Sequence, residues 1–183
     1  MPPISKDNHL YFITCVTNSR LPVFRTERLK QILAAAFDEA RKSAGILIYA
    51  YVYMPDHYHV VTCSRRKASE VLRYLNGISA RRVINYLKEE GFTSSLYKLR
   101  REESSNNNEY RYSLWEHHSN TYFITSEAAL MQKVNYIHMN PVEDGLIDVP
   151  ENYPFSSFRY WKGRPLENEP LEIDIKELTW KRS

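Results

Sequence analysis

Three apolar runs of strand length stand out along the chain. Residues 10–17 read LYFITCVT, and residues 46–54 and 57–64 read ILIYAYVYM and HYHVVTCS. Short runs that are rich in β-branched and aromatic residues and end at polar residues are typical of buried strands. Only Pro55 and Asp56 separate the second run from the third, so these two strands are expected to pair through a tight, hairpin-like connection.

Two segments between these runs show helical spacing of their apolar residues. From Thr26 to Gly45 the apolar positions form one stripe, with Thr26 placed to cap the helix and Gly45 placed to end it. A second helix is expected over residues 69–87, with much of its basic charge along one flank.

The last part of the chain adds one more strand and one more helix. Residues 110–115 are expected to form the strand, after a polar loop over 102–109 with the sequence EESSNNNE. Thr125 or Ser126 would cap the helix that follows. Pro141 must end or kink this helix, because proline lacks the N–H that a helix interior needs.

The predicted elements follow the order β-α-β-β-α-β and then a helix. This order matches the ferredoxin-like split β-α-β arrangement, an α+β fold in which helices pack on one face of a four-stranded antiparallel sheet. The C-terminal helix would be an addition to that fold. Because many unrelated functions use this arrangement, the function must be argued from particular residues.

Length and composition fit one domain with a single core, since the 183 residues are 43% hydrophobic and 26% charged. We expect this domain at 8–161 and a polar C-terminal tail at 162–183. No apolar run approaches the ~20 residues of a membrane span, and the N-terminus lacks a signal peptide, so we expect a cytoplasmic protein with no membrane partner. Two cysteines, Cys15 and Cys63, are too few for a disulfide scaffold and are interpreted as buried thiols.

Positive charge is concentrated in the middle of the chain. Residues 60–101 hold ten Lys and Arg against three Glu, which gives +7 in a protein whose net charge is +3. A basic segment on a near-neutral protein favours a polyanion partner that binds in one place. An ordinary solvated helix face explains the charge equally well.

Two histidines, His57 and His59, lie two residues apart on the third predicted strand. Side chains at i and i+2 of a strand point to the same face, so the two imidazoles are presented side by side. Such a pair can bind a divalent cation if a third ligand comes from elsewhere. The alternative is two half-exposed histidines on a sheet.

Tyr136 and Asn140 are separated by four residues on the last predicted helix, and Lys133 lies three residues before the tyrosine. All three therefore share one side of the helix. A tyrosine can act as a covalent nucleophile, and the amide oxygen of Asn140 can serve as a third metal ligand. With 14 tyrosines in the chain, the alternative of a core residue on an amphipathic helix stays open for Tyr136.

Several segments resemble the REP-associated tyrosine transposases, which belong to the insertion-sequence-type, single-tyrosine HUH transposases. The segments, in chain order, are YFITCVTNSRLPVF at 11–24, YAYVYMPDHYHVVTC at 49–63, LNGISARRVINYLK at 75–88 and YIHMNPVEDGLIDVPENYPFSSFRYW at 136–161. The likeness spans roughly residues 10–161. Members of this family cut and rejoin single-stranded DNA beside a hairpin, with a ferredoxin-like domain, a divalent ion and no nucleotide.

The resemblance implies a role for each of four residues. His57 and His59 match the histidine pair, with Tyr58 between them, and Tyr136 matches the nucleophile. Asn140 takes the position of the third, amide-type ligand of a divalent ion, Mg²⁺ or Mn²⁺. Attack by Tyr136 on the DNA would give a 5′-phosphotyrosine and a free 3′-hydroxyl, which needs no nucleotide cofactor, and no GxxxxGK[ST] motif is present.

The basic segment fits a single-stranded or hairpin DNA partner. Basic side chains would neutralise phosphates, and a tyrosine beside them could stack on unpaired bases. The expected DNA-binding residues are Arg65, Arg66, Arg73, Arg81, Arg82 and Tyr74. Related enzymes occur as dimers and as monomers, and the sequence does not decide between these states.

Three alternatives are weighed against a transposase. A non-enzymatic RNA-binding module shares the fold, but it needs an RNP-like run that this sequence lacks. A relaxase or replication initiator is another HUH nuclease, but the single tyrosine in the last helix favours the transposase branch. The third alternative is a catalytically silent relative that binds hairpin DNA or RNA without cutting it.

Overall fold

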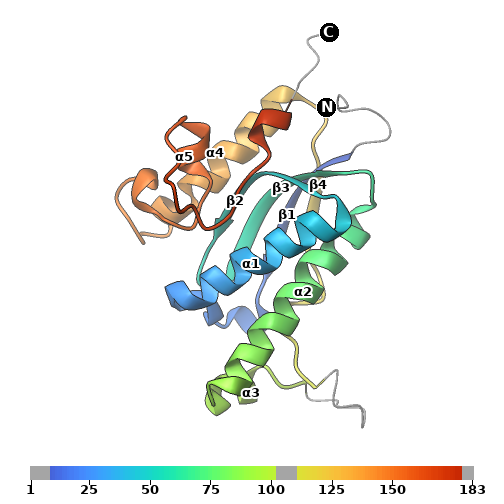
Figure 1. Cartoon of the computed structure of the whole chain (residues 1–183), viewed down its shortest axis with the longest axis vertical. Helices are drawn as coiled ribbons and strands as arrows, with labels where there is room; N and C mark the ends of the chain where they lie inside the picture. The colour runs from blue at the N-terminus through green and yellow to red at the C-terminus, as the bar shows by residue number, and fades with distance from the viewer. Residues whose placement is uncertain (1–8, 102–110, 179–183) are drawn as a thin grey trace.

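The computed structural model describes residues 9–101 and 111–178, and a four-stranded antiparallel sheet forms its centre (Figure 1). The strands lie in the order β2-β3-β1-β4. Their bounds are His9–Val16 for β1, Leu47–Tyr53 for β2, His57–Ser64 for β3 and Asn120–Phe123 for β4. The predicted α+β, ferredoxin-like fold is confirmed, because this strand order places the first and third strands at the centre of the sheet.

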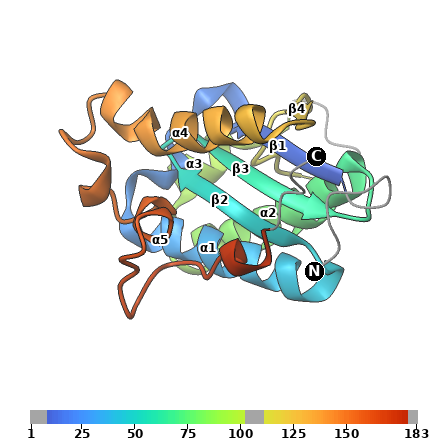
Figure 2. The ribbon, with the colours of Figure 1, turned by 90° about the horizontal axis from the view of Figure 1, so that it is seen from above.

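Helices cover both faces of the sheet. The long helices α1 (Glu27–Ala44) and α2 (Ala68–Glu89) lie on one face, and α4 (Glu127–Glu143) crosses the other (Figure 2). Two short helices, α3 (Thr93–Lys98) and α5 (Phe158–Trp161), complete the set. All eight residues of β3 are buried as a consequence. No helix in the described part of the chain is both long enough and apolar enough to cross a membrane.

Helix α1 has the ends that its sequence predicts. The Leu29 N–H donates to Thr26 Oγ1 at 3.3 Å, and Gly45 adopts a left-handed φ of +64° after the last turn. A hydroxyl cap at the start and a glycine in this conformation at the end satisfy backbone groups that a helix leaves unpaired. Within the apolar stripe, Leu33 and Phe37 are fully buried, whereas Ile32 is only partly buried.

The prediction of a strand at 110–115 is wrong, and the fourth strand lies at Asn120–Phe123. Tyr112 and Trp115 make only isolated bridges. The reason is that Trp115 is a core residue: its ring stacks on Phe24 at 5.4 Å, and its Nε1–H donates to Ser79 Oγ at 3.0 Å. An apolar run that fills the core in this way looks like a strand in the sequence. The loop predicted at 102–109 lies outside the described residues.

Pro141 does not end the last helix, since α4 continues to Glu143 with Pro141 inside it, and a kink at the proline stays a prediction. Next to the proline, the Asp144 N–H donates to the Asn140 carbonyl at 3.0 Å. Hydrogen bonds around the missing donor therefore keep the helix together. Tyr136 and Asn140 both lie within α4, so their four-residue spacing is helical.

The compact body extends beyond residue 161, because the segment from 169 to 178 packs on it. Leu171 and Ile173 are buried. Asp174 pairs with β2, which is an edge strand of the sheet. Its N–H donates to the Ile48 carbonyl at 2.7 Å, and its Oδ2 accepts from the Ile48 N–H at 2.9 Å. The two predicted buried thiols, Cys15 and Cys63, are confirmed as free and buried.

A buried ion pair fastens the C-terminal segment. Arg159 donates from Nε and Nη2 to the two carboxylate oxygens of Glu169, at 2.7 and 2.6 Å. The same guanidinium also donates to three backbone carbonyls, those of Glu151, Tyr153 and Pro154. The Glu169 side chain is only 2% exposed, and among the described residues Arg159 is the only cation that pairs with it, beside a 3.0 Å hydrogen bond from the Leu166 N–H.

Replacing Arg159 by methionine should lower the free energy of unfolding by about 3–5 kcal/mol, because it leaves the buried Glu169 carboxylate unpaired. Urea denaturation measures the loss. Arg164→Met is the matched control: its 3.9 Å pair with Glu151 is exposed on both sides, and it should cost less than about 1 kcal/mol. Equal losses for the two variants would show that the Arg159 pair does not hold the segment.

Candidate active site

His57 and His59 point from β3 toward α4, on the face of the sheet opposite α1 and α2. Their ring centroids are 4.8 Å apart. The side chains are 9% and 4% exposed, which overturns the alternative of two half-exposed histidines. Tyr58 between them points to the other face, where its hydroxyl donates to Asn76 Oδ1 at 2.7 Å. The alternation of the strand thus separates the histidine pair from the main core.

Both ring nitrogens of His57 have a polar neighbour. Nδ1 lies 2.6 Å from Asp56 Oδ1, and Nε2 lies 3.0 Å from Asn140 Oδ1 on α4. When Nδ1–H donates to the carboxylate, Nε2 of the neutral ring presents a lone pair. Two acceptor atoms would then face each other at 3.0 Å, an arrangement that a shared cation stabilises. A carboxylate behind a histidine is the usual support for a metal-binding ring.

The Nε2 atom of His59 has no hydrogen-bond partner within residues 9–101 and 111–178. Nδ1 lies 2.7 Å from Thr14 Oγ1, whereas the buried Nε2 is unpaired. Burial is the main reason that the pKa of His59 is lowered to about 3, and the neighbouring His57 and Lys133 contribute to the same shift. The ring is therefore neutral at physiological pH. An unpaired buried nitrogen is costly, and a bond to a metal ion would satisfy it.

The residues present fit a divalent metal ion with open coordination positions. The donor set consists of two imidazole nitrogens from β3 and one amide oxygen from α4. In residues 9–101 and 111–178, no group of three or more His, Cys, Asp or Glu side chains could hold a metal. A metal at the histidine pair therefore depends on Asn140 as the third protein ligand, and water or substrate oxygens would complete its coordination.

Tyr136 lies beside the histidine pair and remains accessible. Its ring packs edge-on against His59 at 5.1 Å and against Phe12 at 5.9 Å between centroids. The side chain is 41% exposed, while the core of α4 is formed by neighbours such as Val134 and Ile137. The alternative of a core tyrosine is thereby overturned, and a polymer can reach this residue.

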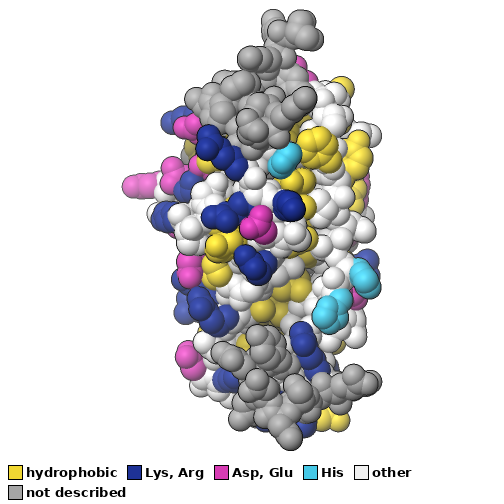
Figure 3. Space-filling model, turned by 90° about the vertical axis from the view of Figure 1, so that its right-hand side faces the viewer, with side chains coloured by type: hydrophobic (Ala, Val, Ile, Leu, Met, Phe, Trp, Pro, Cys, Tyr) yellow, Lys and Arg dark blue, Asp and Glu magenta, His cyan; other side chains and the backbone are white. Residues whose placement is uncertain are grey.

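The expected DNA-binding residues separate into two groups. Arg65 and Arg73 form no ion pair with any described residue. The Arg66 guanidinium lies 5.2 Å over the Tyr74 ring and also donates to the Ala44 carbonyl. This group lies at the end of β3 and the start of α2. Figure 3 shows basic side chains gathered beside exposed hydrophobic ones on the side of the molecule where α2 and β4 lie.

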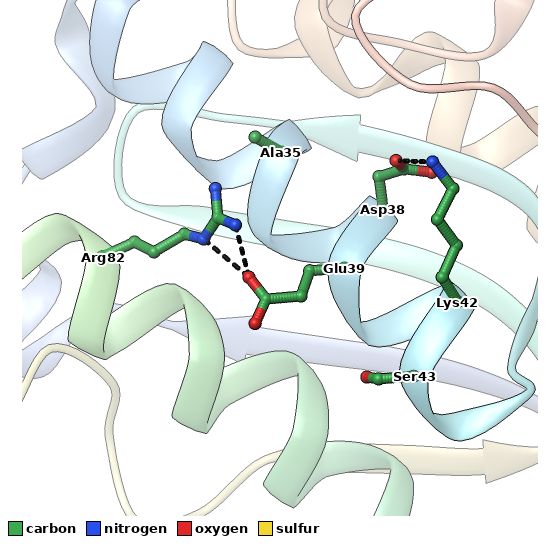
Figure 4. A pocket seen from close by; sticks show the side chains of 6 residues that line it. All are labelled: Ala35, Asp38, Glu39, Lys42, Ser43 and Arg82. Carbon is green, nitrogen blue, oxygen red and sulfur yellow. Dashed lines mark hydrogen bonds and ion pairs between the residues drawn. The ribbon is translucent and has the colours of Figure 1, made fainter.

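Arg81 and Arg82 form the second group, and they share one acidic partner. Arg82 donates to Glu39 from Nε at 2.8 Å and again from Nη2, in the shallow groove between α1 and α2 (Figure 4). Arg81 Nη2 lies 3.3 Å from the other oxygen of Glu39. The carboxylate offsets part of their charge. This groove also lies on the sheet face opposite the histidine pair.

Sequence reasoning missed the residues that support the site. Asp56 and Thr14 contact the Nδ1 atoms of His57 and His59, respectively. Phe12 lies against Tyr136. Asp56 directly precedes His57, so its proximity could have been noticed. The partnership of Thr14 with His59 depends on the pairing register of β1 with β3, which the sequence does not reveal.

Known proteins that are similar to this chain are transposases. A model of the family described as "Transposase IS200 like" matches residues 5–100. A protein of Haemophilus influenzae named as a REP-associated tyrosine transposase is 27% identical over 151 residues, covering 81% of this chain and 79% of its own length.

One solved structure shows the same fold. A REP-associated tyrosine transposase bound to a REP hairpin superposes with a TM-score of 0.61 at 18% identity, covering 100% of this chain and 96% of that one. A transposase from Deinococcus radiodurans superposes with a TM-score of 0.47 at 20% identity, covering 75% of this chain and 94% of that one. Because the family model spans more than half of the 183 residues, this chain belongs to the IS200-like transposase family.

Proposed function

We propose that this protein cuts and rejoins single-stranded DNA beside a hairpin, through a 5′-phosphotyrosine formed on Tyr136. The observation that carries the proposal is the position of an accessible tyrosine against His59, within one helical turn of the third polar group, Asn140. A REP hairpin is bound by the transposase that shares this fold, which supports a hairpin as the partner here.

The protein's own side chains would prepare the reaction. His57, His59 and Asn140 would hold a divalent ion, Mg²⁺ or Mn²⁺, which when bound polarises the scissile phosphate. Asp56 and Thr14 keep the two rings in place.

In the strand transfer, bonds form and break only between the tyrosine and the DNA. The Tyr136 oxygen forms a bond to phosphorus, the bond from phosphorus to the 3′-oxygen breaks, and the proton lost by the phenol is balanced by one gained at the 3′-hydroxyl. The phosphotyrosine retains the energy of the phosphodiester, so attack by another 3′-hydroxyl joins the strand elsewhere without a nucleotide.

The DNA would reach the site from the surface formed by the start of α2. Arg65, Arg66 and Arg73 supply positive charge there, and Tyr74 supplies a ring for an unpaired base. Strand β1 connects this surface to the nucleophile: the Tyr11 hydroxyl reaches the Arg66 carbonyl, and the next residue, Phe12, lies against Tyr136 on the opposite face. Arg81 and Arg82 would contribute less because Glu39 already pairs with them.

Tyr136→Phe should abolish cleavage and the covalent protein–DNA adduct while hairpin binding is retained, because it removes one oxygen from an accessible side chain. Denaturing gel electrophoresis with labelled hairpin DNA detects the adduct. Tyr97→Phe, which alters a more exposed tyrosine on α3, is the control and should cleave normally. An adduct in the Tyr136 variant would assign the nucleophile to another residue.

His57→Ala combined with His59→Ala should abolish Mn²⁺ binding in titration calorimetry, since it removes two of three ligands. Affinity for hairpin DNA, measured with metal chelated, should stay within about twofold, because phosphate contacts carry it. Asp56→Asn should weaken Mn²⁺ binding by about 10–100-fold through loss of ring support. Retained Mn²⁺ affinity in the double variant would show that the metal ion does not bind at His57 and His59.

Arg65→Ala with Arg73→Ala should weaken DNA binding and reduce the slope of log affinity against log salt by about 0.7–0.9 for each phosphate that the variant no longer neutralises. Arg81→Ala with Arg82→Ala should reduce it less, because Glu39 offsets their charge. Fluorescence anisotropy titrations at several salt concentrations measure both slopes. An unchanged slope in the first pair would identify the start of α2 as a solvated face only.

A further inference from the structure

Lys133 is held between two aromatic rings next to the candidate nucleophile. Its Nζ lies 4.7 Å from the centroid of Phe12 on β1 and 5.0 Å from that of Tyr122 on β4. Phe12 and Tyr122 are cross-strand partners in the sheet register, so their rings stand side by side on the face that α4 covers. The ammonium group is thereby fixed in position by three elements.

No carboxylate neutralises this ammonium among the described residues, since none of their ion pairs involves Lys133. Lys42 on α1 is different, because it pairs with Asp38 at 2.6 Å. A lysine has three N–H donors, and ring faces attract the cation without accepting strong hydrogen bonds from it.

The position of Lys133 relative to Tyr136 is defined by the helix and by a shared neighbour. The two residues are three apart on α4 and therefore adjacent on its surface. Phe12 contacts both, through the Lys133 Nζ at 4.7 Å and the Tyr136 ring at 5.9 Å. Tyr122, the other ring at the ammonium, is 48% exposed, so a ligand approaching Tyr136 can also reach this edge.

We propose that Lys133 binds a phosphate of the DNA strand that Tyr136 attacks, at or directly beside the scissile position, with Phe12 and Tyr122 holding the ammonium in place. The inference rests on the proposed function and adds to it a specific contact. A fixed, unpaired cation beside a nucleophile meets the negative charge of a phosphodiester without having to reorganise. The competing interpretation is a structural contact that only ties β4 to α4.

The test measures binding in a Tyr136→Phe background with metal chelated, so its result does not depend on whether a phosphotyrosine forms. Lys133→Met should weaken single-stranded DNA binding by about tenfold, the value of one charged hydrogen bond, and lower the salt slope by about 0.7. Lys133→Arg should keep most of the affinity. Lys162→Met is the matched control, because Lys162 is an exposed lysine over a single ring, that of Phe158 at 5.4 Å, and it should change neither quantity.

Uncharged methylphosphonates, placed singly along the DNA, identify the phosphate. A methylphosphonate at one position, at or next to the cleavage site, should weaken DNA binding by the parent Tyr136→Phe protein. The same methylphosphonate should not weaken further the DNA binding of the variant that also carries Lys133→Met. Unchanged affinity and slope in Lys133→Met, or an equal additional loss at every methylphosphonate position, would overturn the proposal. Thermal unfolding of each variant checks folding, and a lower melting temperature in Lys133→Met with unchanged DNA binding would establish the structural interpretation instead.

Discussion

The contact between α4 and the central strand β3 is the interaction on which the site depends. Strand β3 supplies the two histidines and α4 supplies Tyr136 and Asn140, so no single element contains the complete set. The 3.0 Å approach of His57 Nε2 to Asn140 Oδ1 shows how closely the two elements meet. Burial of the apolar side of α4 on the sheet drives this contact, and the polar groups are brought together as a result.

This arrangement gives the two faces of the sheet different roles. The face under α1 and α2 is packed with large side chains such as Phe37 and Tyr58 and holds no part of the candidate site. The opposite face is covered by one helix, which leaves Tyr136 accessible at its margin. A strand that alternates its side chains can thus serve the core and the chemistry together, since Tyr58 points one way while His57 and His59 point the other.

Local periodicity explains what could be predicted from the sequence. The two-residue spacing of His57 and His59 and the four-residue spacing of Tyr136 and Asn140 place each pair on one face whatever the tertiary structure is. The strand order followed from the order of the elements. The contacts of Thr14 and Phe12 with the site depend on long-range strand register, and the sequence did not predict them. The four-residue strand β4 is too short and too exposed to give a clear pattern. Charge counting found the basic segment, but only the structure shows that Arg81 and Arg82 share Glu39 while Arg65 and Arg73 do not.

The two edges of the sheet differ in a way that limits self-association. Along β2, backbone groups are already bonded to the later chain: the Tyr53 N–H donates to the Phe155 carbonyl, and the Ser157 N–H donates to the Tyr51 carbonyl. Within the described residues, β4 pairs only with β1. Among the described residues, the β2 edge is therefore blocked against strand pairing with another chain, whereas the β4 edge has no such cover.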